Sequence, residues 1–386
     1  MFNLGYYQKG LKFKGINQNP PGILWFLVAM VLLSIVDLRS QDYIGGDFFA
    51  GKVLRHKEGL LFDIPAVSSG FDIWYQKQTS GEKAWHRYWG KPRIEGLIKY
   101  VSFGNDEVLG RAFAIAPGIS FRMKQWDRSR LNFHYAPGVA YLNKQFNLST
   151  NPTNNAIGSN INNLTRLKIS YERPVGERWK MSIAASFSHF SNGLTSSPNS
   201  GINVYGLNLG FQRKVRDQKT DINFEKREDL KFRRWGINMM YTLGLSEWVV
   251  SGGPNYPIYN YSFGGYWRFK DFQKLHLGAE YEFSNKEYQF QLSVFAEDDI
   301  AKRRSRRTVI YIAEEIILGD FSGRLQLGFY TPIASEYGSN PFNIKVMTLY
   351  HPPIEPLGNV KPYVAMILKT HFAVAEYIGL AAGVTF

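Results

Sequence analysis

The sequence predicts an all-β protein, an antiparallel transmembrane β-barrel of about 12–16 strands that follows an N-terminal signal peptide. Apolar and polar residues alternate along most of the chain after residue 50, aromatic residues gather near the ends of the alternating segments, and the last segment ends on Phe386. Alternation with a period of two gives a strand one apolar and one polar face. In lipid such a sheet has to close, because no water hydrates an open edge.

The first forty residues predict a secretory signal. Lys9, Lys12 and Lys14 precede a hydrophobic run at residues 23–36, and a basic start before a short apolar run is typical of such signals. The run is shorter than the roughly 20 residues that a membrane-spanning helix needs. We expect cleavage after Ser40, which leaves residues 41–386 as the exported barrel in the bacterial outer membrane.

Composition narrows the classes of function. The chain has no cysteine, which excludes disulfide scaffolds, thiolate metal sites and cysteine nucleophiles. The formal net charge is +14, but Lys and Arg are spread along the chain, so we expect no nucleic-acid partner. The one dense basic run, residues 302–307, is interpreted as a solvated loop, with contact to lipopolysaccharide phosphates as the alternative. The sequence predicts no cofactor and no metal site.

The alternation predicts sixteen candidate strands. They lie near residues 44–54, 70–78, 93–103, 110–124, 130–144, 165–173, 179–191, 203–214, 232–246, 259–269, 275–284, 306–318, 321–331, 343–350, 360–370 and 377–386. The alternation is weakest in the first of these and near 306–318 and 343–350, so the expected number is even and between 12 and 16.

Connection lengths predict an orientation for the barrel. Tight links at 125–129, 174–178, 270–274 and 319–320 each join an even strand to the next odd one, whereas long links such as 145–164 fall on the other side. Bacterial barrels have short periplasmic turns and long extracellular loops. The tight links are therefore placed in the periplasm. The link at 215–231 breaks this pattern, because it is long on the short side.

One strand end carries candidate chemistry. Along residues 179–191 the apolar, lipid-facing row ends in His189 and Ser191, and Asn203 begins the next strand with the same facing. Residues i and i+2 of a strand share a face, so His189 is placed to take the Ser191 proton while the hydroxyl attacks an ester carbonyl. Backbone N–H groups near Asn192 and Gly193, where the chain turns, are placed to hold the oxyanion. The alternative is that a rim His and Ser only mark the boundary between lipid and water.

The wider motif resembles a known family. The H-x-S-N at 189–192, the P-N-x-G-I at 198–202 and the asparagine-rich loop at 151–162 resemble the PagL-type lipid A deacylases, especially their longer acyloxyacyl hydrolase relatives in Bacteroidetes. The compact members have eight strands, so the resemblance is expected to cover residues 85–214.

The resemblance implies an outer-membrane serine esterase that removes an ester-linked acyl chain from lipid A in lipopolysaccharide. Ser191 would be the nucleophile and His189 the general base, and Asn199 joins Asn192 and Gly193 as an oxyanion or turn residue. The compact members carry a Glu where Asn203 stands. An amide orients the imidazole but cannot neutralise its positive charge, and the matching change in a serine protease lowers turnover about 10⁴-fold.

Two other functions stay open from the sequence. A barrel of 12 or more strands can enclose a polar lumen, which would make a non-enzymatic channel or transport barrel with charges on the lumen side. The charges expected there are Lys168, Arg268, Glu280, Glu282 and Arg324. The third possibility is a soluble exported β-sandwich, which the C-terminal strand and the aromatic rows disfavour. A terminal strand that ends on an aromatic residue also resembles the signal read by the outer-membrane assembly machinery.

Overall fold

The computed structural model describes residues 41–56, 58–216, 232–248, 251–331, 341–354, 358–371 and 374–386. The predicted signal peptide lies outside these residues. The strands of the first half are β1 (Asp42–Val53), β2 (Ser68–Gln78), β3 (Arg93–Ser102), β4 (Arg111–Gln125), β5 (Arg130–Leu142), β6 (Ile161–Pro174), β7 (Trp179–Ser191) and β8 (Ile202–Arg216). Those of the second half are β9 (Trp235–Glu247), β10 (Asn255–Lys270), β11 (Gln273–Ser284), β12 (Arg306–Leu318), β13 (Phe321–Tyr330), β14 (Phe342–Tyr350), β15 (Lys361–His371) and β16 (Val374–Thr385).

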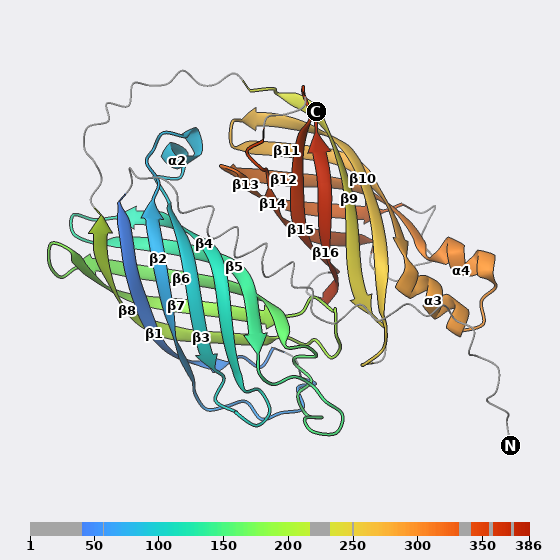
Figure 1. The fold of residues 1–386 in the computed structure, drawn as a ribbon, viewed down its shortest axis with the longest axis horizontal. Helices are drawn as coiled ribbons and strands as arrows, with labels where there is room; N and C mark the ends of the chain where they lie inside the picture. Colours follow the sequence, from blue (N-terminus) through green and yellow to red (C-terminus); the bar gives the residue numbers. More distant parts are fainter. Residues whose placement is uncertain are drawn as a thin grey trace.

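The described strands are antiparallel and number sixteen, the upper end of the predicted range, but they do not form one barrel. Strands β1–β8 close into a first barrel and β9–β16 into a second (Figure 1). This corrects the expectation of one continuous barrel from residue 41 to 386. The reason is that β8 pairs with β1, from Val53↔Val204 to Asp42↔Arg216, so its edge is occupied and cannot continue to β9. The long link that broke the sequence pattern is the connection between the two barrels.

Three short helices of the described residues lie outside the walls. Helix α2 (Ala84–Tyr88) occupies the β2–β3 connection, and α3 (Asn285–Ser293) and α4 (Asp298–Arg304) follow β11. Helix α2 and the C-terminus lie at one end of the molecule, whereas α3 and α4 lie toward the other end of the second barrel (Figure 1). None of the helices among the described residues has the length and apolar character needed to cross a membrane.

Side chains fill the interior of the first barrel. Arg166 is completely buried and contacts three carboxylates, Asp72 at 2.8 Å, Glu95 at 3.2 Å and Asp47 at 3.5 Å. Lys168 adds a contact of 2.5 Å to Asp47. An eight-stranded barrel is just wide enough for its inward side chains to occupy the centre, and here those side chains form a paired ionic core.

The second barrel has an ionic interior of the same kind. Its buried pairs are Arg324–Glu315, Lys345–Glu280 and Lys369–Glu282, each at 2.7 Å. Four of the five charges expected on the lumen side, Lys168, Glu280, Glu282 and Arg324, are buried, and Arg268 is half-buried on the same inward row. Within their own barrels, the four buried charges are paired with opposite charges rather than exposed along an open channel, and the Arg268 guanidinium donates to the Asp271 carbonyl.

The outer faces are apolar. Exposed large hydrophobic side chains occupy the outward rows of both barrels, and examples are Phe48 at 77% exposure, Leu207 at 70% and Leu277 at 64%. Trp235 and Trp267 stack with ring centroids 5.7 Å apart on the second barrel, which fits the aromatic girdles of membrane barrels. A soluble sandwich has an apolar interior and a polar exterior, and these barrels have the opposite arrangement. The possibility of a soluble exported β-sandwich is therefore not supported.

The two barrels contact each other at the end that carries α2. Tyr88 of α2 packs on Phe272, in the β10–β11 turn, with ring centroids 4.3 Å apart. Trp85 of α2 joins Phe272 and Ile119 in one apolar cluster, and the Lys270 ammonium lies 4.9 Å from the Tyr88 ring centroid. Helix α2 thus docks the first barrel onto a turn of the second.

Candidate active site

The candidate residues come from two paired strands at one rim of the first barrel. Strands β7 and β8 pair from Trp179↔Arg213 to Phe190↔Ile202, which sets His189 directly opposite Asn203. Ser191 ends β7 two residues beyond the histidine and therefore shares its face. On these strands the odd-numbered row points outward, as the exposed Ile183 and Leu207 show. The structure thus brings the three residues together on the outer face, as the sequence predicts.

The three side chains form a continuous hydrogen-bonded chain. His189 Nδ1 lies 2.6 Å from Asn203 Oδ1, and His189 Nε2 lies 2.9 Å from Ser191 Oγ. The amide oxygen can only accept, so the ring proton sits on Nδ1 and is donated to Asn203. The lone pair of Nε2 then accepts the Ser191 hydroxyl proton. This arrangement presents a serine whose proton has a base in hydrogen-bonding contact.

The turn after Ser191 is organised by Asn192. Its backbone N–H donates to Asn199 Oδ1 at 3.0 Å, and its own side-chain oxygen accepts from the Leu194 N–H at 3.0 Å. Its amide nitrogen donates to the Ser196 carbonyl at 2.7 Å. The Asn192 N–H, predicted from the sequence to be an oxyanion donor, is thus already bonded to Asn199. Gly193 follows with a left-handed φ of 63°, a conformation that glycine adopts at no steric cost.

The asparagine-rich loop after β5 supports this turn. The Gly158 carbonyl accepts from Ser196 Oγ at 2.8 Å, and the Ala156 carbonyl accepts from the Gly201 N–H at 2.9 Å. Gly201 has a φ of 79°, and a Cβ built there would come within 2.9 Å of His189 Cε1. A glycine at this position therefore lets the backbone pass close to the imidazole. The loop at 151–162 and the motif at 198–202 are parts of one packed unit.

Two residues at this rim were not predicted from the sequence. His56 Nε2 donates to the Ser200 carbonyl at 2.9 Å, although 144 positions separate the two residues in the chain. Glu247, at the end of β9 in the second barrel, accepts the Ser197 N–H, and its own N–H donates to the Leu194 carbonyl at 3.1 Å. Neither belongs to a local motif, because both reach the turn only through the folding of distant segments.

The closed antiparallel barrels, with apolar outer faces and ionic interiors, define the class as an outer-membrane β-barrel protein. Within that class, residues 69–212 match the family described as lipid A 3-O-deacylase (PagL). The match falls entirely within the first barrel and begins earlier than the expected residue 85. The second barrel lies outside it. No individual curated protein matches the sequence.

Two solved structures show a weak likeness to this chain. Neisserial surface protein A is 8% identical, covers 45% of this chain and 96% of its own length, and has a TM-score of 0.31. The outer-membrane enzyme PagL is 17% identical, covers 44% and 97% respectively, and has a TM-score of 0.28. Both likenesses are weak, so the family match and the side-chain geometry are the observations that bear on function.

Proposed function

We propose that the first barrel is a serine esterase that hydrolyses an ester-linked acyl chain of lipid A in the outer leaflet of the bacterial outer membrane. The observation that carries the proposal is the chain of hydrogen bonds from Ser191 through His189 to Asn203 on the lipid-facing side of the rim. The family match over residues 69–212 supports the substrate class. No cofactor is needed for this chemistry.

The reaction begins at the serine. His189 Nε2 takes the Ser191 proton while Oγ bonds to the ester carbonyl carbon, and the carbonyl electrons move onto oxygen. When the tetrahedral intermediate collapses, the C–O bond to the sugar breaks and His189 passes its proton to the departing alkoxide. Water, deprotonated by the same nitrogen, then releases the fatty acid from the acyl-serine. Asn203 holds the ring in the tautomer that this cycle needs.

Two groups are candidates to stabilise the oxyanion. Because Asn199 accepts the Asn192 N–H through its oxygen, the NH₂ of its side-chain amide remains available to donate. The Gly193 N–H is the backbone donor that follows the engaged Asn192 N–H. Each would act where negative charge develops in the transition state, and losing one donor of this kind typically costs 10²–10³-fold in turnover.

The surface beside the triad suits an acyl chain. The outward row of β8 is open to lipid, with Tyr205 47%, Leu207 70% and Leu209 50% exposed, and Ile183 of β7 is 57% exposed beside it. A fatty acid lying along this row keeps contact with hydrocarbon while its ester reaches Ser191 at the rim. The lipopolysaccharide substrate would thus stay in the membrane throughout the reaction.

The alternative of a channel or transport barrel has less support, because ion-paired side chains fill both interiors. We also infer export by the predicted signal peptide and insertion by the outer-membrane assembly machinery.

The direct test is mass spectrometry of lipid A from cells that express the wild type, Ser191→Ala or His189→Ala. We expect one acyl mass to disappear only with the wild type. Heat-modifiable migration on gels would show that all three proteins are folded. Unchanged lipid A in cells with folded wild-type protein in the outer membrane would overturn the lipid A assignment.

A further inference from the structure

The turn that follows Ser191 is bound to the second barrel. The Ser197 N–H donates to Glu247 Oε2, the Glu247 N–H donates to the Leu194 carbonyl at 3.1 Å, and Glu247 Oε1 accepts the Gly252 N–H at 3.1 Å. Glu247 is only 3% exposed. One buried carboxylate thus joins the turn of the first barrel to the β9–β10 connection of the second.

Apolar packing reinforces this junction next to the nucleophile. A Cβ built on Gly193 would lie 3.0 Å from Ile378 Cβ and 3.5 Å from Leu368 Cδ1. Both of these side chains are on outward rows of the second barrel, in β16 and β15, and both are half-buried rather than exposed. The wall of the second barrel therefore lies against the residue whose N–H is a candidate oxyanion donor.

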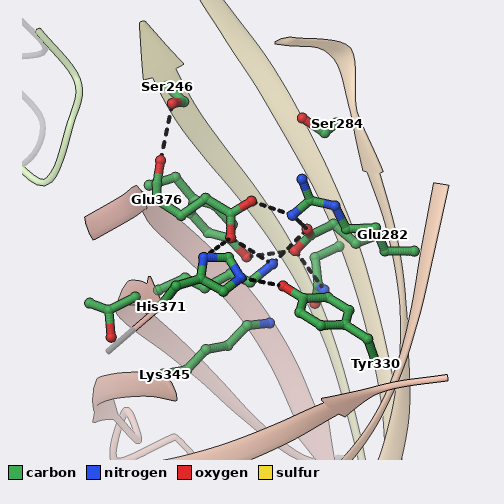
Figure 2. A network of polar contacts seen from close by, with 12 residues as sticks. Ser246, Glu282, Ser284, Tyr330, Lys345, His371 and Glu376 are labelled. Atoms are coloured by element: carbon green, nitrogen blue, oxygen red, sulfur yellow. Dashed lines mark hydrogen bonds and ion pairs between the residues drawn. The ribbon is translucent and has the colours of Figure 1, made fainter. Parts of the chain in front are cut away.

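The strand that carries Glu247 is itself firmly held. Its neighbour Ser246 donates to the Glu376 carbonyl at 3.0 Å and accepts from Lys286 Nζ at 3.1 Å. The Glu376 carboxylate contacts Lys369 at 3.0 Å and His371 at 3.5 Å, within the polar network at the mouth of the second barrel (Figure 2). This network crosslinks β9, β15 and β16, so the end of β9 forms a rigid base for the glutamate.

We propose that the second barrel is an anchor for the esterase site and that Glu247 is its positioning residue. By fixing Leu194 and Ser197 it holds the Gly193 N–H in place relative to Ser191. This inference rests on the proposed esterase function and assigns to it a residue outside the segment that matches the deacylase family. Glu247 has no hydrogen bond to His189 among the described contacts, so it acts through the turn and does not replace the missing acid of the triad.

The test compares Glu247→Gln with Glu314→Gln. A glutamine can accept only one of the two N–H groups that the carboxylate accepts, and its NH₂ would face the other donor. Glu314 of β12 is exposed and lies opposite Leu275, near the β10–β11 turn, whereas Glu247 lies at the other end of the barrel opposite Asn255, so the Glu314 variant controls for loss of one charge. We expect the turnover number of Glu247→Gln to fall about tenfold or more with little change in KM, because misplaced groups act on the transition state. Glu314→Gln should match the wild type.

A second readout does not depend on catalysis. The chain has no cysteine, so Thr195→Cys can carry a single nitroxide label on the turn. We expect the label to be immobile on a folded barrel with Glu247 and to become mobile with Glu247→Gln. Wild-type turnover and an immobile label in Glu247→Gln would overturn the anchor while leaving the esterase intact. If the wild type shows no more hydrolysis than Ser191→Ala, the esterase fails, and the label alone then decides whether the second barrel holds the turn.

Discussion

His189 and Asn203 face each other across β7 and β8, with Nδ1 of the ring 2.6 Å from the amide oxygen. The hydrogen bond orients the imidazole and selects its tautomer. It supplies no negative charge to stabilise the imidazolium that would form in the proposed mechanism, when Ser191 gives up its proton. On the proposed function, the site would act by general-base catalysis without the electrostatic contribution of an acidic third member.

The first prediction concerns that missing charge. Asn203→Asp keeps the shape of the side chain and adds a carboxylate, so we expect turnover to rise by about tenfold or more, while Asn203→Ala lowers it. A carboxylate also stabilises protonated His189 in the free enzyme, so the acid side of the pH–rate profile should move to higher pH in Asn203→Asp. Ester hydrolysis measured across a pH series checks both effects. Equal rates in all three proteins would mean that Asn203 does not act on the histidine.

The second prediction concerns the glycine beside the imidazole. Gly201→Ala adds a Cβ 2.9 Å from His189 Cε1 in a left-handed conformation. We expect it to displace the ring and to reduce hydrolysis while the barrel still folds. Gly358→Ala is the matched control, since Gly358 has a φ of 64° but no neighbour within 4 Å. If both variants lose activity equally, backbone strain rather than contact with the imidazole is responsible.

The third prediction concerns the core of the first barrel. Arg166→Ala leaves Asp47, Asp72 and Glu95 buried without their shared partner, and breaking a buried pair in this way costs about 3–5 kcal/mol. We expect a clear drop in the urea midpoint for loss of the folded gel form. Arg111→Ala removes an exposed pair with Asp106 and should leave the midpoint almost unchanged. A similar midpoint for both variants would contradict the ionic core described for this barrel.

The fourth prediction tests the contact between barrels. The spacing between the Gly193 position and Ile378 Cβ is 3.0 Å, near the Cβ–Cβ range of disulfides. We expect Gly193→Cys with Ile378→Cys to crosslink in the oxidising periplasm and to migrate faster on denaturing gels without reductant. Gly193→Cys with Ile310→Cys is the control, because Ile310 is 52% exposed on β12. Crosslinking of the control alone, or of neither pair, would contradict the docking of the turn on β16.

Much of the fold follows from the sequence, because alternation is a local property. Each of the sixteen predicted segments corresponds to a strand of the structure, with ends shifted by a few residues. What alternation cannot predict is closure. Whether β8 pairs with β1 or continues to β9 depends on contacts between segments far apart in the chain, and both arrangements give each residue the same facing. The single large barrel was the wrong choice for this reason.

The candidate site likewise contains residues that local patterns predict and residues that only long-range folding brings there. His189, Ser191 and Asn203 could be placed together from spacing within one strand and facing on the next. The partner of the Asn192 N–H could not be predicted from the sequence, because it depends on how the turn folds back to Asn199. His56 and Glu247 were missed because they arrive from the end of β1 and from another barrel. Local patterns predict the proposed reacting groups, and long-range folding supplies the groups that contact the turn beside them.

The docking of Glu247 on the turn has a consequence for biogenesis. The first barrel closes through β1 and β8 alone, so it needs no strand from later in the chain to seal its wall. Ser191 and His189, the proposed nucleophile and base, are then already in place. The Glu247 carboxylate that contacts the adjoining turn belongs to β9, which follows the linker. If the second barrel anchors the site as proposed, full esterase activity is reached only when the second barrel docks. A half-assembled chain would then leave the surrounding lipids unhydrolysed.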